Sequence, residues 1–359
     1  MSGTTIRELA ALCGVAVSTV SRAINGHPEV SPETRRRIVE MAKKHHYVAN
    51  SSARSLKVRS TNVIAVLIQG DLSPIFLPMI RMFEDEIEKT EFSLVLTYIS
   101  DEEAEAGVMA RVVRDRKISG VVFLGRYGDE AEGALSSQQL AEMGTPIVFC
   151  TTSDFSGSRS PHSSVSIDDR AGSAAITTLL LERGHRRIAY LGAGDPGDAE
   201  QVWALRVAGF RAAVKDFPAP ARARVLAAAV PQRLYTMENG YETMRRALED
   251  GLDATAIVAL CDTVAVGAIK ALSERGLRVP EDVSVTGFDD IDYAHYAVPG
   301  LTTVSQPLQH IVRESTRILL DIIADPGRGA EIIQLLGPIV ERGSVAAPSP
   351  QGVGRLTTH

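Results

Sequence analysis

Four side chains near the N-terminus have types and spacing suited to contacting nucleic acid. Val17, Ser18, Ser21 and Arg22 include pairs spaced three and four residues apart, so a helix would present all of them on one side. Hydroxyl and guanidinium groups can donate hydrogen bonds to phosphate oxygens and base edges, and the small side chains let the helix enter a groove. The first chemistry that this chain suggests is recognition of DNA.

Two short helices over a tight turn would position those side chains. Gly14 can take the positive φ that ends the first helix, and the second is expected from about Val17 to Asn25-Gly26. Ser31-Pro32 would begin a third helix with an N-cap hydroxyl and a proline in its first turn. Apolar residues at helical intervals predict the inward faces of the first two helices, which are Ile6, Leu9, Ala10 and Cys13, and then Val20, Ala23 and Ile24. This pattern is typical of a helix-turn-helix, which places its second helix in the major groove.

Residues 1–60 also differ in charge from the rest of the chain. They contain ten Lys or Arg and four Asp or Glu, a net of +6, whereas the other 299 residues contain 28 and 40, a net of −12. A basic segment on an acidic chain favours a phosphate-binding surface. The alternative is a small helical protein-interaction module with a solvated basic face, but spacing, caps and charge together favour DNA.

The length of 359 residues suits two or three domains. No apolar run approaches the roughly 18 residues that span a bilayer, and the amphipathic N-terminus is unlike a signal peptide, so we expect a cytoplasmic protein with no membrane partner. Cys13, Cys150 and Cys261 are far apart and form no Cys-x-x-Cys pair. We expect them to be reduced core or cleft residues, and we expect no metal and no cofactor.

From Asn62 onward, apolar strand-like runs alternate with amphipathic helical segments, as in parallel α/β architecture. The first series predicts strands at 63–68, 93–98, 120–124 and 147–150, helices at 74–90, 104–116 and 137–143, and a polar crossing at 157–161. The second predicts strands at 187–191, 224–229, 256–260 and 283–287, with helices at 170–183, 200–214, 237–250 and 263–275. Two similar halves suggest a duplicated Rossmann-like unit, whose ligands lie beyond the carboxyl ends of the strands.

The segment Gly192–Gly197 has the form G-x-G-x-x-G, so a dinucleotide-dependent enzyme is an alternative. However, Pro196 removes an amide donor from this loop, and the next predicted strand ends without a carboxylate for a ribose. His162, His295 and His310 have neither a serine nucleophile motif nor metal-ligand spacing nearby. We therefore interpret the loop as a turn that lines a cleft, and we expect no enzyme activity.

The stretch Thr5–Gly26 closely resembles the head of the LacI/GalR family of bacterial transcription regulators. The resemblance continues to about residue 343 and includes Val30-Ser31, Glu33-Thr34-Arg35, Tyr47, Asn50 and Ala53-Arg54-Ser55-Leu56. Ala16 departs from it, because the family usually has a serine there as the cap of the second helix, and loss of that hydroxyl costs about 1 kcal/mol of helix stability. His46 and Ala49 also replace the usual Gly and Pro around Tyr47.

The resemblance implies a bilobal body similar to periplasmic sugar-binding proteins, with the chain crossing between lobes near residues 161, 291 and 323. The expected fold class is thus a small all-α helix-turn-helix head on an α/β body of two Rossmann-like lobes with parallel sheets. We expect the head at 1–49, a hinge at 50–60, an effector-binding and dimerisation body at 61–343, and a flexible tail at 344–359. The N-lobe would comprise about 61–160 and 292–322, and the C-lobe about 161–291 and 323–343.

The family pattern also assigns DNA contacts. Bases would be read by Val17, Ser18 and Arg22, and the expected phosphate or accessory contacts are Thr5, Ser21, Asn25, Asn50 and Ala53. The segment Asn50–Lys57 is shorter than the about 12–15 residues that a stable isolated helix needs, so it can fold when DNA and a partner subunit supply contacts. Leu56 matches the leucine that wedges into a base step in the minor groove. The alternative is a flexible basic linker.

The same resemblance implies an effector site. Asp289, just beyond a predicted strand, matches a ligand hydrogen-bond acceptor, and Arg206 matches an arginine that donates to ligand oxygens. The alternatives are a turn cap and an ordinary surface arginine. Further candidates are the aromatic residues Phe76 and Tyr235, which could equally be core residues, and Arg126 and Glu200 at positions that vary with the ligand.

Together these features predict a sequence-specific transcriptional regulator, a repressor, that binds a palindromic operator as a homodimer under control of a sugar or related metabolite. The tail has no leucine heptads, which favours a dimer over a tetramer. A periplasmic solute receptor without DNA function is the alternative with the same body, but it does not account for the basic head.

Overall fold

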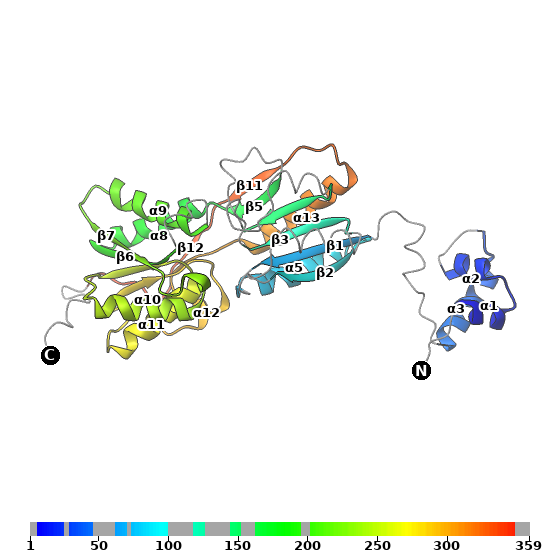
Figure 1. Ribbon diagram of the computed structural model, residues 1–359, viewed down its shortest axis with the longest axis horizontal. Helices are drawn as coiled ribbons and strands as arrows, with labels where there is room; N and C mark the ends of the chain where they lie inside the picture. The colour runs from blue at the N-terminus through cyan, green and yellow to red at the C-terminus, as the bar shows by residue number, and fades with distance from the viewer. Residues whose placement is uncertain are drawn as a thin grey trace. The chain divides into compact units, whose positions relative to one another are not determined.

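A computed structural model describes residues 6–24, 29–45, 62–69, 73–99, 118–125, 144–151, 162–194 and 202–348. The chain forms two compact units, Met1–Thr61 and Asn62–His359, which we call the head and the body (Figure 1). The predicted helices at 104–116 and 137–143 and the predicted crossing at 157–161 lie outside the described residues.

The head has the predicted arrangement of three helices, α1 (Ile6–Cys13), α2 (Val17–Ile24) and α3 (Pro32–Lys44). Gly14 has a φ of 63°, as a turn this tight requires. The Ser31 hydroxyl caps α3 by accepting a hydrogen bond from the Thr34 amide at 3.2 Å. The core of the head is formed by Leu9, Ala10, Cys13, Val20, Ala23, Val30 and Ile38. Periodicity in the sequence therefore identified the buried residues of α1 and α2 correctly, except that the side chains of Ile6 and Ile24 lie outside the described part.

The cap of α2 differs from that of α3. Ala16 offers only its carbonyl, which accepts from the amides of Thr19 and Val20 at 2.9 and 3.2 Å. Because alanine has no hydroxyl, the first turn of α2 begins without a side-chain cap at this position.

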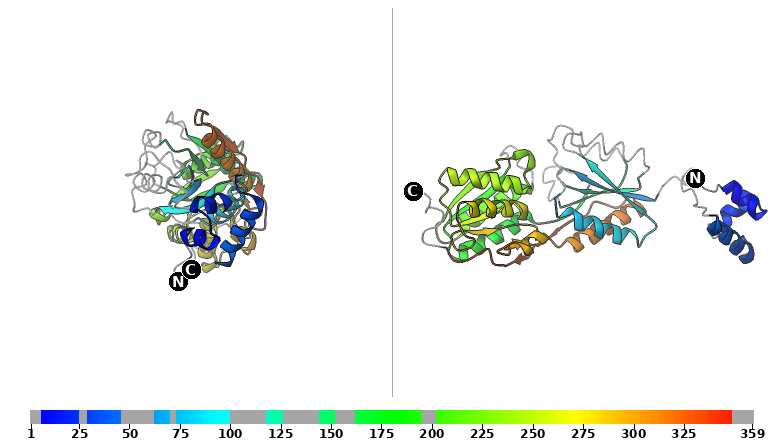
Figure 2. Two further views of the ribbon diagram at one scale, coloured as in Figure 1. Left: turned by 90° about the vertical axis from the view of Figure 1, so that its right-hand side faces the viewer. Right: turned by 90° about the horizontal axis from the view of Figure 1, so that it is seen from below.

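The first lobe of the body contains a parallel six-stranded sheet in the order β11-β5-β4-β3-β1-β2. The helices α5 (Phe76–Ile87) and α13 (Leu308–Ala324) pack against each other on one face of it (Figure 2). In chain order, the strands are β1 (Val63–Gln69), β2 (Ser93–Ile99), β3 (Gly120–Leu124), β4 (Ile147–Cys150), β5 (Ser163–Ile167) and β11 (Ile332–Leu335).

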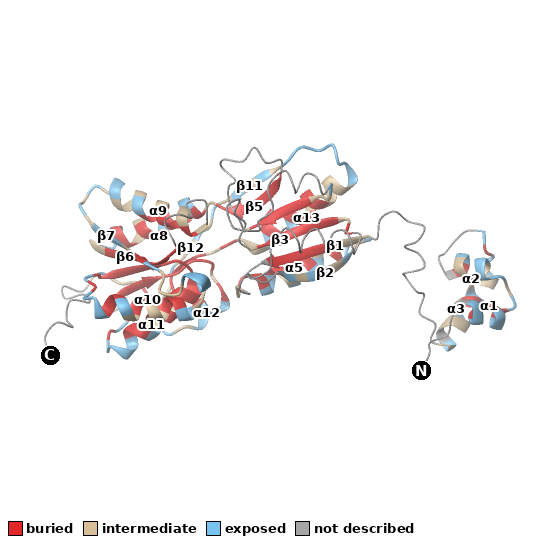
Figure 3. Cartoon of the chain, viewed as in Figure 1, coloured by how far each residue is buried: buried red, intermediate tan, exposed pale blue. Residues whose placement is uncertain are grey.

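The second lobe contains a parallel four-stranded sheet in the order β7-β6-β8-β9. One face is covered by α8 (Asp169–Glu182) and α9 (Val202–Asp216), and the other by α10 (Met237–Glu249) and α11 (Asp262–Glu274) (Figure 1). Its strands are β6 (Arg187–Ala193), β7 (Arg222–Ala227), β8 (Ala256–Ala259) and β9 (Ser284–Thr286). The central strands of both sheets are buried, as expected for sheets with helices on their faces (Figure 3).

Small elements complete the second lobe. They are η1 (Pro231–Arg233), α12 (Asp292–Tyr296), and an antiparallel pair of β10 (Thr303–Val304) and β12 (Ile339–Val340). Beyond β12, the buried Ser344 hydroxyl donates to the Val285 carbonyl at 2.6 Å. Residues 344–348, which were expected to belong to a flexible tail, therefore pack on this lobe. We call this segment the strap.

The chain crosses between the lobes at three places, each later than expected. The first crossing follows β5, because Ser163–Ile167 pairs with β4 and β11 in the first sheet rather than beginning the second lobe at 161. The second follows β10, because α12 packs against α11. The third lies between β11 and β12, because Ile332–Leu335 still pairs with β5. Thus 292–304 belongs to the second lobe, and the first keeps residues up to about 335.

Among the described residues, none of the helices is long and apolar enough to cross a membrane. The three cysteines are unpaired and buried, as predicted.

An unusually close approach of α8 and α9 depends on Gly209. A Cβ on this residue would lie 2.1 Å from the carbonyl oxygen of Arg170, which is backbone and has little freedom to move. The Ser173 hydroxyl donates to the Arg206 carbonyl at 2.6 Å across the same contact. Only glycine permits this separation of the two helices.

Gly209→Ala should force α8 and α9 apart. We expect the free energy of unfolding to fall by about 1–3 kcal/mol, as for other overpacked cores, which urea denaturation can measure. Gly329→Ala is the control, since a Cβ there meets nothing within 4 Å. Equal stability of the two variants would contradict the close approach.

Candidate functional site

The exposed face of α2 carries the side chains that the sequence predicted. Val17 is 41% exposed, Ser18 and Arg22 are exposed, and Ser21 is half-buried. Val20 on the opposite face is fully buried. Thus α2 keeps its apolar side in the core of the head and presents a small, polar surface to solvent.

Arg22 has a partner that the sequence analysis missed. Its Nη1 lies 3.1 Å from Oε2 of Glu29, and the two side chains are 57% and 64% exposed. Exposed ion pairs of this kind contribute only about 0.2–1 kcal/mol. Arg22 can therefore exchange Glu29 for a stronger acceptor, such as a group on DNA. In the sequence, this pair is indicated only by an acidic residue in a basic head.

The remaining predicted DNA contacts cannot be placed, because they lie outside the described residues. These are Thr5, Asn25, Asn50, Ala53 and Leu56.

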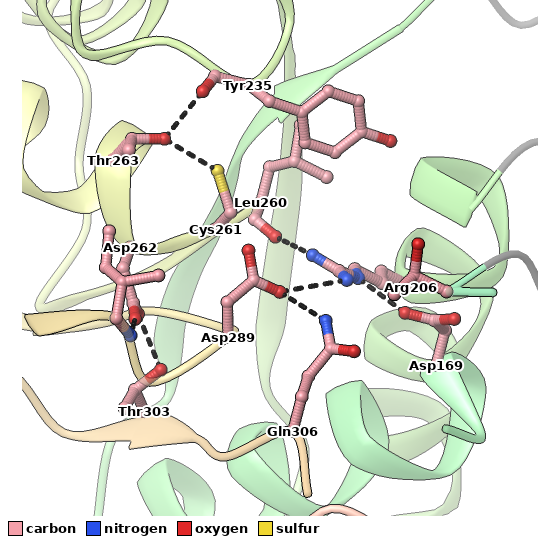
Figure 4. A network of polar contacts seen from close by, with 12 residues as sticks. Asp169, Arg206, Tyr235, Leu260, Cys261, Asp262, Thr263, Asp289, Thr303 and Gln306 are labelled. Carbon is pink, nitrogen blue, oxygen red and sulfur yellow. Dashed lines mark hydrogen bonds and ion pairs between the residues drawn. The ribbon is translucent and has the colours of Figure 1, made fainter. Parts of the chain in front are cut away.

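The body holds a buried arginine at the center of a polar network (Figure 4). Arg206 is 4% exposed, and its Nε donates to Oδ1 of Asp169 at 2.8 Å. Its Nη1 donates to the Leu260 carbonyl at 2.7 Å, and its Nη2 to Oδ1 of Asp289 at 3.3 Å. The guanidinium carbon lies 3.7 Å from the centroid of the Phe288 ring. Arg206 is thus no ordinary surface arginine, which removes one alternative.

Each partner of Arg206 comes from a different element at the same end of the second sheet. Asp169 is the first residue of α8, directly after Asp168, whose side chain accepts from the Ala171 amide. Leu260 follows β8 and Asp289 lies just beyond β9. The carboxyl ends of parallel strands therefore bring the network together, where α/β folds bind ligands.

Asp289 adopts a backbone conformation that few non-glycine residues take, with a φ of 109°. Its Oδ1 also accepts from Nε2 of Gln306 at 2.7 Å. The neighbouring Asp290 accepts from Nη2 of Arg342 at 2.7 Å, so it holds the segment just after β12 and does not cap a helix. The two adjacent aspartates thus face different partners.

Burial and charge act against each other in this network. Burial opposes the charged form of Arg206, but the carboxylates of Asp169 and Asp289 outweigh it and raise the pKa of the guanidinium. Burial also raises the pKa of Asp289, while Arg206 and the hydrogen bond from Gln306 act in the opposite direction. The arginine therefore stays charged, and the carboxylates depend on it.

Neutral polar groups surround the charged ones. The Thr263 hydroxyl donates to the Tyr235 carbonyl at 2.7 Å, so the Cys261 thiol, 3.0 Å away, is the donor to Thr263. Burial raises the pKa of this thiol to about 12. Burial also raises the pKa values of the phenols of Tyr190 and Tyr235. These groups remain uncharged at neutral pH.

Of the side-chain polar atoms that are buried without a hydrogen-bond partner among the described residues, three belong to residues close to this network. They are Oη of Tyr190, Nε1 of Trp203 and Oε1 of Gln306. Tyr190 interacts electrostatically with Arg206 and Tyr235, Trp203 lies one turn before Arg206 on α9, and Gln306 binds Asp289. Unsatisfied buried polar groups are costly, so these three atoms support a place for a ligand near Arg206.

The other predicted effector residues have varied outcomes. Phe76 is 7% exposed and packs in the apolar core of the body, whereas Tyr235 is half-buried beside Cys261. Arg126 and Glu200 lie outside the described residues.

The glycine-rich loop has a packing role in its described part. A Cβ on Gly194 would lie 2.7 Å from Nε1 of the Trp203 indole. The missing side chain thus makes room for this ring, which accounts for that glycine without a dinucleotide. No group of His, Cys, Asp and Glu within the described ranges could hold a metal ion.

Comparison with known proteins finds a matching family model for the head and another for the body. Residues 5–50 match the model for bacterial regulatory proteins of the lacI family, and residues 177–345 match a periplasmic binding protein-like domain. The HTH-type transcriptional regulator MalR of Clostridium butyricum is 31% identical over 341 residues, 94% of this chain and 98% of that protein. The HTH-type transcriptional repressor PurR of Erwinia tasmaniensis is 32% identical over 349 residues, 95% and 97% of the two chains.

Solved structures give the same fold over nearly the whole length. The lac repressor dimer bound to operator and the anti-inducer ONPF aligns with a TM-score of 0.79 at 23% identity, covering 96% of this chain and 100% of that one. A complex of the transcriptional regulator CelR with cellobiose aligns with a TM-score of 0.68 at 28% identity, covering 95% and 99%.

A helix-turn-helix head on a periplasmic-binding-protein-like body defines a class of DNA-binding transcriptional regulators that carry an effector-binding domain. The chain belongs to the lacI family of bacterial regulatory proteins. The predicted resemblance and fold class are thereby confirmed.

Glu29→Gln should strengthen binding of the full-length chain to non-specific duplex DNA by about 1.4–5-fold, because it frees Arg22 from a pair worth about 0.2–1 kcal/mol. Fluorescence anisotropy at fixed salt measures this. Glu40→Gln, an exposed acid on α3, removes the same charge elsewhere in the head. Equal gains in both variants would mean that net charge matters and the Arg22–Glu29 pair does not.

Proposed function

We propose that this regulator is a repressor that binds a palindromic operator as a homodimer and responds to a small hydroxylated metabolite, a sugar or a related compound. The observation that carries the effector half is Arg206, which is buried between two carboxylates, close to polar atoms that have no partner within the described residues. The relatives named as a regulator and a repressor support the DNA half. The CelR complex, which contains cellobiose, supports a sugar.

On the DNA side, two copies of α2 would read two half-sites. Val17, Ser18 and Arg22 would contact bases from the exposed face. The expected phosphate or accessory contacts are Thr5, Ser21, Asn25, Asn50 and Ala53. Because Val17 and Ser18 are small, α2 reads few base positions itself, and Leu56 in the minor groove would add specificity through bending.

On the effector side, Arg206 would donate to ligand oxygens and Asp289 would accept from ligand hydroxyls. Tyr235, in the same group of residues (Figure 4), offers an aromatic face. Phe76, Arg126 and Glu200 complete the candidate set from the sequence. The function needs no chemical step, which fits a non-enzymatic protein that works on DNA in the cytoplasm.

The network offers a physical route from ligand to DNA, because it touches the segments that cross between lobes. Asp169 follows the first crossing, after β5, and Gln306 lies in the second, between β10 and α13. The Asp168 amide donates to the Leu335 carbonyl at the start of the third. A ligand that re-pairs Asp289 would also release or tighten Gln306. We propose that this changes lobe closure and, through it, the ordering of the hinges.

Selection from a random duplex library with the full-length chain supplies an operator for the central test. We expect a symmetric footprint, and we expect at least one uncharged sugar or related metabolite to raise the melting temperature saturably and shift operator affinity at least tenfold. Asp289→Asn should keep operator binding and lose that response; Asp282→Asn is the matched acidic control. A single-half-site footprint, or a response untouched by Asp289→Asn, would overturn the proposal.

Leu56→Ala should weaken operator binding much more than non-specific binding, because the wedge acts only when the hinge folds on its site. Titrations of the operator and a scrambled duplex at the same salt concentration measure both affinities. Equal losses on the two duplexes would contradict the hinge model.

A further inference from the structure

Arg206 is shared by two carboxylates rather than matched to one. Asp169 and Asp289 each have an oxygen at hydrogen-bond distance from the guanidinium, at 2.8 and 3.3 Å, and Asp169 is only 2% exposed. Among the described contacts, one guanidinium is therefore shared by two buried carboxylates.

The arginine nevertheless keeps hydrogen-bonding capacity. A guanidinium has five N–H groups, and among the described residues three of them are engaged, by Asp169, the Leu260 carbonyl and Asp289. A ligand oxygen can use the others. It would meet good donors whose positive charge is already offset.

The nearby atoms that lack a partner in the described part of the chain are uncharged, and they include both donors and an acceptor. Tyr190 and Trp203 offer donors, and Oε1 of Gln306 is an acceptor. A ligand with hydroxyl groups can serve donors and acceptors at once. A carboxylate or sulfate has acceptors only, so it would leave Gln306 unsatisfied and add a further negative charge beside Asp169 and Asp289.

We infer that Asp169 is a specificity-determining residue, which offsets the charge of Arg206 so that the effector site accepts uncharged hydroxylated ligands and rejects anions. This inference rests on the effector site of the proposed function. It adds that one carboxylate beside Arg206 sets which charge class of metabolite can be sensed.

A purely structural role for Asp169 predicts something different. In Asp169→Asn the amide oxygen can still accept from Nε of Arg206, so the geometry of the pair is kept while the negative charge is lost. Asp169→Ser removes the charge with a smaller side chain and tests the same point if the asparagine variant folds poorly. Only a charge role makes these variants gain affinity for an anion.

Inorganic sulfate is the probe, titrated into the full-length chain at constant ionic strength. The single tryptophan, Trp203, lies on α9 one turn from Arg206 and reports binding by fluorescence. Asp290→Asn is the matched control, because Asp290 pairs with Arg342 and has no bond to Arg206 among the described contacts. Urea denaturation confirms that each variant is folded.

We expect Asp169→Asn or Asp169→Ser to bind sulfate saturably and at least tenfold more tightly than the unmodified chain, with Asp290→Asn unchanged. A smaller gain, or an equal gain in Asp290→Asn, overturns the inference. The sulfate titration involves neither DNA nor the natural effector. It can therefore fail while the operator complex still responds to a metabolite, and it can succeed when that response is absent.

Discussion

The second lobe is organised by the need to compensate one buried positive charge. An unpaired guanidinium in a protein interior is strongly unfavourable, so Arg206 can be buried only where acceptors converge on it. The structure supplies a carboxylate from the start of α8, a carbonyl after β8, a carboxylate after β9 and the face of Phe288. Because these acceptors come from separate elements, the charge of Arg206 stabilises the arrangement of those elements at the carboxyl end of the sheet.

That compensation requires two helices to lie very close. Asp169 can reach Arg206 because α9 approaches α8 at Gly209, and the Ser173 hydroxyl bridges the same contact. The site is thus positioned by backbone packing rather than by flexible side chains. Packing of this kind responds to a ligand in discrete steps, which suits a domain that must convert binding into a change between states.

The sequence predicted what periodicity and local motifs can show. The inward faces of α1 and α2 and most strands of both sheets follow from apolar spacing. By contrast, β5 consists of Ser163–Ile167, whose serines are buried by pairing with β4 and β11 and give no apolar signal. Asp169 was not among the predicted site residues, because nothing local reveals a partner 37 positions away. Gly194 matched a nucleotide motif but accommodates Trp203. Tertiary packing, which local sequence patterns do not reveal, decided each of these cases.

Two arginines with acidic partners show how solvent exposure determines what an ion pair can do. Arg22 and Glu29 are more than half exposed, so their pair is weak and water can replace either partner at little cost. Arg206 and Asp169 are almost fully buried, so breaking their pair would leave charges without compensation. The first arrangement suits a group that must leave one acceptor for another on each encounter with DNA. The second arrangement suits a side chain that must stay in position while a ligand binds and dissociates. A new contact to Arg206 would change its interactions with each of the elements that supply its acceptors.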